Sequence, residues 1–325
     1  MKPSLGKTLS SKSFWLNNIV YIVCVLAFIV FAIINPVLVS KDNIMNILAS
    51  ASTFIVLGTG VAFALLIQQT DLSVGSIMYA AAAIMFYFFK QDKNLPIPVV
   101  MLIGIAVGIA VGLINGVIIA TLKVYAFLPT LATQVAFRGL GLIIAGASIS
   151  NMPMKWAKIV SLRWFGMPAY IIISFLLAIA AQLFLVYTKL GRHIYATGDN
   201  EKIAKEKGIN TYGIKLFAFA FSGFMAALGG ILSCAKTMTA SYVIGEGYEF
   251  KAITACVLGG VSLNGGRGTV FPGVVIGALI ISLISNLLVL FNADTYIYDI
   301  VYGIVIFVVV MIDTFKIIEE KKHLA

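Results

Sequence analysis

Long apolar runs without charged residues alternate along the chain with short polar segments. A helix of about 20 apolar residues can cross the hydrocarbon core of a bilayer, so this pattern predicts about ten membrane-spanning helices. We expect the spans at residues 14–34, 44–67, 74–89, 99–121, 127–147, 167–188, 214–235, 250–263, 270–291 and 296–312. The predicted fold class is an all-α, polytopic membrane protein. The span at 74–89 is short, and we expect it to begin inside the protein and not in lipid.

The composition supports a membrane protein. Apolar residues make up 61% of the chain and charged residues only 11%, whereas soluble domains carry about a quarter charged residues. The net charge of +10 comes from lysines and arginines spread between the apolar runs, which is not the basic stripe of a nucleic-acid-binding protein. More of them fall on the side of both termini, which predicts cytoplasmic ends.

Few side chains could hold a metal ion. Cys24, Cys234 and Cys256 lie in apolar runs without the spacing of zinc ligands, and His193 and His323 fall in expected cytoplasmic segments. We therefore expect no metal site, no cofactor in this chain and no intramembrane acid-base pair.

Four glycines recur at intervals of four residues on the span at 99–121: Gly104, Gly108, Gly112 and Gly116. This spacing gives one helix face without side chains, along which a neighbouring backbone can pack closely. We favour packing within the chain over a dimer seam, because such faces are common inside helix bundles.

Arg138 is the one charge well inside an expected span, where burial costs about 2.5–3.5 kcal/mol or more. Two interpretations stay open: Arg138 lines a polar translocation cavity, or it reaches the interface or backbone carbonyls of a broken helix near Pro129. The other polar side chains expected to face the bundle interior are Gln68, Gln69, Asn115, Gln134, Gln182 and Asn286.

Several strings resemble the permease subunits of ribose-type sugar importers of the ABC class. Residues 70–76 read T-D-L-S-V-G-S, in which Asp71 can cap the next helix, and they resemble the family's I-D-L-S-V-G-S segment. Residues 127–133 with 138–140 are similar to P-F-I-x-T-L-G-T…R-G-L, residues 196–209 to G-x-N-x-x-A-A-x-x-x-G-I, and residues 245–268 to G-x-G-Y-E…L-G-G-T-S-L-x-G-G-x-G. The matches run from about Asp42 to Asp313 in the same order.

The resemblance implies a single transmembrane permease domain over residues 1–325, with a cytoplasmic coupling loop at about 189–215. In such permeases a short helix of this loop sits in a groove of the ATPase subunit. We expect that helix between Gly198 and Gly208, which are natural helix terminators, with small Ala204 allowing close docking. The candidate coupling residues are Gly198, Asn200, Glu201, Ala204, Gly208 and Ile209.

The resemblance also implies the partners. Two copies of the chain would form one pathway in a bacterial-type cytoplasmic membrane, each engaging a separate ATP-binding subunit, with an extracytoplasmic sugar-binding protein on the opposite face. The chain itself would be a transport subunit and not an enzyme, and its solute a monosaccharide, ribose or a related pentose or hexose. The candidate residues for the translocation path or the family motif are Gln69, Asp71, Ser73, Gly75, Asn115, Thr130, Arg138 and Asn286.

Two other functions stay open. An ABC importer of nucleosides is one alternative, because the resemblance implies that the binding protein largely selects the solute. Gln68 and Gln69 stand where the family often has small residues, which affects the choice of sugar more than the class of transporter. A secondary carrier for a small polar solute is the other, although the expected spans lack the acidic residues of a proton-coupled carrier. Transport that persists without an ATPase partner would favour the carrier.

Overall fold

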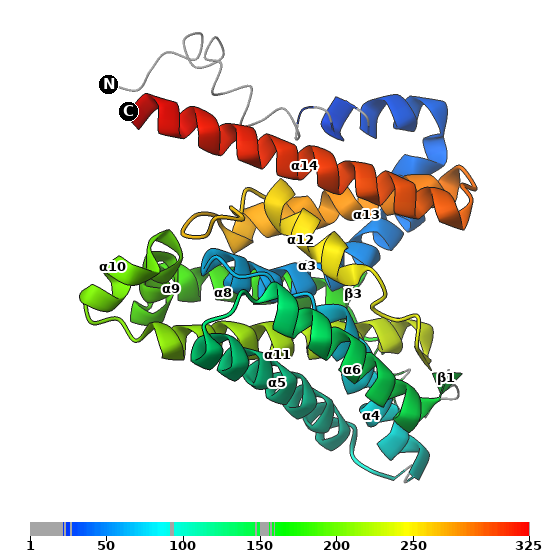
Figure 1. Cartoon of the computed structure of the whole chain (residues 1–325). Helices are drawn as coiled ribbons and strands as arrows, with labels where there is room; N and C mark the ends of the chain where they lie inside the picture. Colours follow the sequence, from blue (N-terminus) through cyan, green and yellow to red (C-terminus); the bar gives the residue numbers. More distant parts are fainter. Residues whose placement is uncertain are drawn as a thin grey trace. The chain divides into compact units, whose positions relative to one another are not determined.

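The computed structural model describes residues 22, 24–26, 28–91, 94–146, 148–149, 156, 158 and 160–324, which are predominantly helical (Figure 1). They divide into two compact units. The larger covers Leu48–Ser282, and the smaller combines the described residues up to Ile47 with those from Leu283 onward. The expectation of one domain over the whole chain stays a prediction.

Most of the long helices begin and end close to the limits set by the apolar runs. Their bounds are α3 Lys41–Leu66, α4 Val74–Gln91, α5 Ile97–Leu122, α6 Phe127–Ala145, α8 Ala169–Tyr187, α9 Lys189–Asp199, α10 Glu201–Glu206, α11 Thr211–Thr237, α12 Tyr248–Leu258, α13 Val275–Leu290 and α14 Thr295–Leu324, with short turns η1 Pro36–Val39 and η2 Val270–Val274. The predicted first span, 14–34, lies partly outside the described residues.

Within the part of the chain that the structure describes, six stretches are long and apolar enough to cross a membrane: α3, α5, α6, α8, α11 and Val270–Leu290. The count of about ten spans stays a prediction. Of the two spans expected to be short, α12 has 11 residues, whereas α4 has 18 and is only one residue shorter than α6. At 1.5 Å per residue α12 covers only about 16 Å. The first residue of α4, Val74, is fully buried, as expected for a helix that begins inside the protein.

The core of the larger unit is built on the close packing of α11 against α5, with α4 packed against both of them and against α6. Two of the four spaced glycines show how close this packing is. A methyl group built on Gly108 would lie 2.4 Å from the carbonyl oxygen of Gly223, and one on Gly112 would lie 2.2 Å from that of Phe219. The glycine face of α5 is therefore occupied by a helix of the same chain.

Two short strand pairs interrupt the expected all-α fold among the described residues. β1 Ser148–Ile149 pairs antiparallel with β4 Ala240–Ser241, and β2 Arg163–Trp164 pairs antiparallel with β3 Met167–Pro168. The sequence could not predict them, because two residues are too few to show an alternating pattern. They tie together loops at helix ends and leave the fold predominantly helical.

The smaller unit is held by a reciprocal amide pair. Asn43 and Asn286 each donate to the other's side-chain oxygen, at 2.9 and 2.8 Å, and Asn43 also donates to the carbonyl oxygen of Leu38. The rings of Phe31 and Phe291 meet edge to face at 5.4 Å. Asn286 thus has a structural partner in its own unit.

Candidate functional site

A buried carboxylate organises the loop between α3 and α4. Asp71 is fully buried; its Oδ1 accepts hydrogen bonds from the backbone nitrogen and the hydroxyl of Ser73, and its Oδ2 accepts one of 2.7 Å from the hydroxyl of Ser222 on α11. Ser73 directly precedes α4, and its carbonyl accepts from Ile77. Asp71 therefore fixes the turn into α4 and ties it to α11, a wider role than the simple cap that we expected.

The same network reaches α5 and α6. The amide of Asn115 donates to the Ser73 hydroxyl at 2.9 Å, and the hydroxyl of Thr133 donates to the Asn115 amide oxygen at 2.9 Å. Hydrogen bonds between side chains of different helices contribute about 0.6–2 kcal/mol each in membranes. The structure thus brings Asp71, Ser73 and Asn115 together in one chain of bonds linking α11, α4, α5 and α6.

Gln69 and Thr130 hold the start of α6. The side-chain oxygen of Gln69 accepts from the backbone nitrogen of Ala126 at 3.2 Å. The hydroxyl of Thr130 donates to the carbonyl oxygen of Ala126 at 2.7 Å, and it lies 3.5 Å from that of Thr70. Both residues therefore secure the loop after α3 against α6.

Arg138 bonds to backbone carbonyls. Its guanidinium donates to the carbonyl oxygens of Tyr242 and, at 3.5 Å, of Ile244, and it lies 5.8 Å from the ring centre of Tyr79. This matches the carbonyl-binding interpretation, with one correction. Pro129 stands in the first turn of an unbroken α6, a position that tolerates proline, so the carbonyls belong to the segment before α12.

Glu249 is a buried acid that the sequence analysis left out. It is 3% exposed, and its Oε1 accepts a hydrogen bond of 2.7 Å from the amide of Gln134. Gly75 lies against it, since a methyl group built there would be 2.5 Å from Glu249 Oε2 and 2.2 Å from the carbonyl oxygen of Gly245. The string G-Y-E carried the signal, but the expected span began at residue 250, one position too late to include this acid.

The expected coupling helix is α10. The side chain of Asn200 caps it by accepting from the nitrogen of Ile203 at 3.0 Å, and Gly208, at φ +81°, follows its end. Glu201 pairs with Lys205 and, on α11, with Lys215, both at 2.9 Å. Burial raises the pKa of Glu201, but the hydrogen bonds and charges of the two lysines outweigh it, so the pKa lies below its usual value. The helix is thereby anchored to the start of α11.

The exposed face of α10 does not include Ala204. Ala204 is only 3% exposed and packs into its own chain, whereas the neighbouring Ile203 is 52% exposed. The backbone nitrogen of Ile209 donates to the carbonyl oxygen of Ala204 at 3.0 Å. A methyl group on Gly198 would lie 1.7 Å from the carbonyl oxygen of Leu66. The small residues of this segment therefore serve packing within the chain, and Ile203 is an exposed apolar side chain of α10.

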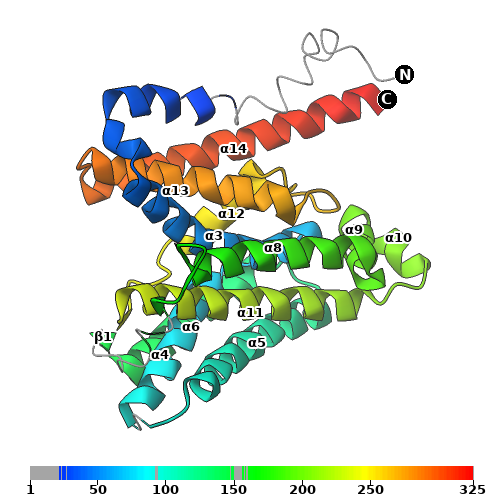
Figure 2. The ribbon, with the colours of Figure 1, turned by 180° about the vertical axis from the view of Figure 1, so that it is seen from behind.

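The helix α11 extends between two regions of the larger unit, one that contains α10 and one that contains β1. In both views α10 lies near one end of α11 and β1 near the other (Figures 1 and 2). β1 pairs with β4, which follows the last turn of α11. Ser222 stands near the middle of this 27-residue helix, so the bond to Asp71 lies about halfway between the two ends.

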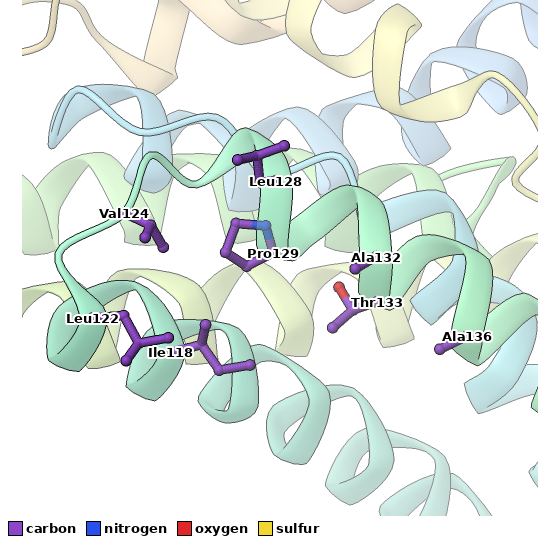
Figure 3. A pocket seen from close by; sticks show the side chains of 8 residues that line it. All are labelled: Ile118, Leu122, Val124, Leu128, Pro129, Ala132, Thr133 and Ala136. Carbon is purple, nitrogen blue, oxygen red and sulfur yellow. The ribbon is translucent and has the colours of Figure 1, made fainter.

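An open groove of about 380 Å³ lies between α5 and α6 (Figure 3). Its lining is apolar except for the hydroxyl of Thr133, and consists of Ile118, Leu122, Val124, Leu128, Pro129, Ala132, Thr133 and Ala136. Such a wall cannot satisfy the hydroxyl groups of a sugar. Among the described residues, no cluster of three His, Cys, Asp or Glu side chains could hold a metal ion.

Comparison with known proteins places these features in a family. Residues 43–310 match the family model described as the permease component of branched-chain amino acid transport systems. The chain is 37% identical over 302 residues to the ribose import permease protein RbsC of Haemophilus influenzae, covering 91% of this chain and 92% of that protein. It is 32% identical to the RbsC of Escherichia coli K12, covering 93% and 95%.

The autoinducer 2 import system permease protein LsrC of Photorhabdus luminescens is 34% identical, covering 84% of this chain and 82% of that protein. No solved structure matches the chain.

Proposed function

Because this chain belongs to the permease family of branched-chain amino acid transport systems, we propose that it is the membrane-spanning subunit of an ATP-driven, binding-protein-dependent importer of ribose or a related monosaccharide. Support for the solute comes from the relatives named for ribose import, which match over more than nine-tenths of the chain. The family description and the autoinducer 2 relative define two other solutes to test.

The observation that carries the proposal is the attachment of α10 to α11 and of α11 to Asp71. Glu201 on α10 pairs with Lys215 near the start of α11, and Ser222 bonds Asp71 seven residues further on. At 1.5 Å per residue these attachments are about 10 Å apart along one helix. A displacement of α10 would therefore move the buried loop before α4 through a rigid element.

The proposed partners follow from the two ends of α11. A separate ATP-binding subunit, which would hydrolyse the ATP, contacts α10 through the exposed Ile203. The dense basic charge of residues 189–215 favours the cytoplasm for this end, and the end with β1 and β4 then faces the extracytoplasmic binding protein. Two copies of the chain, each with about ten spans and cytoplasmic termini, form the pathway.

Transport then proceeds by alternating access. ATP-driven closure of the ATPase subunits brings the two α10 helices together, and the helix bundles rock to open the pathway to one side at a time. Directionality arises because ATP and the loaded binding protein stabilise different states. This chain needs to supply a polar passage and no tight sugar site.

Reconstitution tests the proposal. Proteoliposomes containing the permease, its ATP-binding subunit and the sugar-binding protein should accumulate labelled ribose only with ATP, and leucine and autoinducer 2 should be taken up much less. Vesicles with the permease alone should show no uptake. Ribose uptake by the permease alone would instead establish a secondary carrier. Preferential uptake of a nucleoside by the complete importer would establish a nucleoside importer.

A further inference from the structure

Two helices of the larger unit begin at the same point inside the protein. α4 begins at Val74 and α12 begins at Tyr248. The backbone at the start of α4 is in contact with the backbone that leads into α12. A methyl group on Gly75 would lie 2.2 Å from the carbonyl oxygen of Gly245, and one on Gly245 would lie 2.2 Å from that of Gly75. The first turn of a helix has free N–H groups and a partial positive charge, so two such turns meet here.

This meeting point lies deep in the bundle. Asp71, which leads into α4, is bonded to Ser222 near the middle of the 27-residue α11. Non-helical backbone at such depth is tolerated where it is buried in protein or lines a cavity. Pairs of interrupted helices that begin near the bilayer centre are a recurrent way of building solute sites in transporters.

Glu249 adds an independent observation. Its side chain is more than nine-tenths buried, and its Oε2 accepts no hydrogen bond within the part of the chain that the structure describes. Leaving a buried carboxylate oxygen without a donor is costly. Gly75 lies directly against this atom, so the open acceptor faces the contact between the two helix starts.

The neighbouring polar groups are engaged elsewhere. Gln134 donates to the other oxygen, Oε1. The guanidinium of Arg138 is bonded to the carbonyl oxygens of Tyr242 and Ile244, and the carboxylate of Asp71 accepts from Ser73 and Ser222. None of these groups donates to Glu249 Oε2 in this structure, so the oxygen is open to a donor from outside this set.

We propose that Glu249 Oε2 is a contact for the transported solute and accepts a hydrogen bond from a hydroxyl group of a neutral sugar when the Gly75 and Gly245 segments separate. A carboxylate can only accept, so it selects solutes rich in hydroxyl donors and repels anionic ones. This assignment rests on the proposed function, and it names the residue that recognises the sugar within the permease. The closed contact between the glycines suits a solute that passes through without being held.

Glu249→Gln removes the charge and keeps the shape, and Glu246→Gln is the matched control because Glu246 is an exposed acid in the same segment. Both variants are reconstituted as the full importer with its ATP-binding subunit and binding protein. Ribose uptake and ATP hydrolysis are measured in the same vesicles. For Glu249→Gln we expect the sugar carried per ATP to fall about tenfold, the size of one charged hydrogen bond, with hydrolysis within about twofold of the wild type.

The outcomes separate the two proposals. Unchanged uptake by Glu249→Gln overturns the assignment of Glu249 while leaving the importer function intact. A parallel fall of uptake, hydrolysis and thermal stability identifies a structural role and also overturns it. Absence of ATP-dependent ribose uptake by the wild type overturns the proposed function and this inference together.

Wild-type protein provides a second measurement that does not depend on the variant's folding. The assembled importer is treated with dicyclohexylcarbodiimide during ATP turnover, and carboxyl modification is measured by peptide mass spectrometry. Saturating ribose should lower modification of Glu249 and leave that of Glu246 unchanged. Equal modification of Glu249 with and without ribose contradicts a contact with the sugar.

Discussion

Gly112→Ala is the sharpest test of the packing between α5 and α11. The added methyl group would lie 2.2 Å from the carbonyl oxygen of Phe219 and 2.9 Å from its carbonyl carbon. Real contacts of this kind are rarely shorter than about 3 Å, so the two helices would have to separate by close to 1 Å along their shared face. Both obstructing atoms belong to backbone, which cannot rotate away, and overpacking of this kind costs about 1–3 kcal/mol.

Gly139→Ala is the matched control, because nothing lies within 4 Å of a methyl group at that position of α6. Alanine in a helix is favoured over glycine by about 1 kcal/mol, so this variant should be as stable as the wild type or more so. The stability of both variants is measured by thermal unfolding of the detergent-solubilised chain, with size-exclusion chromatography as the readout of the folded fraction. Equal midpoints for the Gly112 variant and the wild type would refute the close packing.

Three further predictions concern the polar network and the coupling helix. Ser222→Ala leaves an oxygen of the buried Asp71 without its donor, so it should destabilise the chain by about 1–3 kcal/mol in thermal unfolding, whereas Ser233→Ala on the same helix should have little effect. Ile203→Glu should leave the chain folded and abolish sugar-stimulated ATP hydrolysis, unlike Lys202→Glu; normal stimulation would contradict docking through Ile203. Because the pKa of Glu201 is lowered by its lysines, its stabilisation of α10 is present above the unfolded value of about 4.3 and is lost as pH falls through the lower folded value, which hydrogen exchange of α10 at decreasing pH should detect.

The expected span at 99–121 falls within α5, Ile97–Leu122. This span could be predicted because a helix that crosses lipid needs an uninterrupted apolar run, which is visible in the sequence. Two helix ends were wrong for physical reasons. The span expected at 250–263 ends at Leu258, since Gly259 and Gly260 follow and Gly260 has φ +85°. α14 continues to Leu324 beyond the expected residue 312, because its polar end can remain helical outside the apolar run.

The candidate site was less predictable, because its bonds join residues far apart in the sequence. Asp71 and Ser222 are separated by 151 positions, and no motif marks Ser222 as the partner. Ala204 was expected to allow close docking on a partner, but a sequence cannot tell whether the surface near a small residue belongs to the same chain or to another. The burial of Ala204 shows that it packs within its own chain, and it leaves Ile203 as the exposed apolar side chain of α10.

The packing also indicates which contacts can change during transport. α5 and α11 meet backbone to backbone at their glycines. By contrast, only 17% of the apolar stretch of α6 is buried, compared with 83% for α3. The side-chain hydrogen bond that joins α6 to α5 is the one between Thr133 and Asn115. We therefore expect α5 and α11 to move as one body and the direct contact between α5 and α6 to open, because a single hydrogen bond costs less to break than a continuous packed face, while α6 stays packed against α4. A disulfide between cysteines placed at Gly116 and Leu216 should leave ribose uptake intact, and one between cysteines placed at Asn115 and Thr133 should block it until reduced. Full uptake with the second crosslink in place would show that the α5–α6 contact does not open.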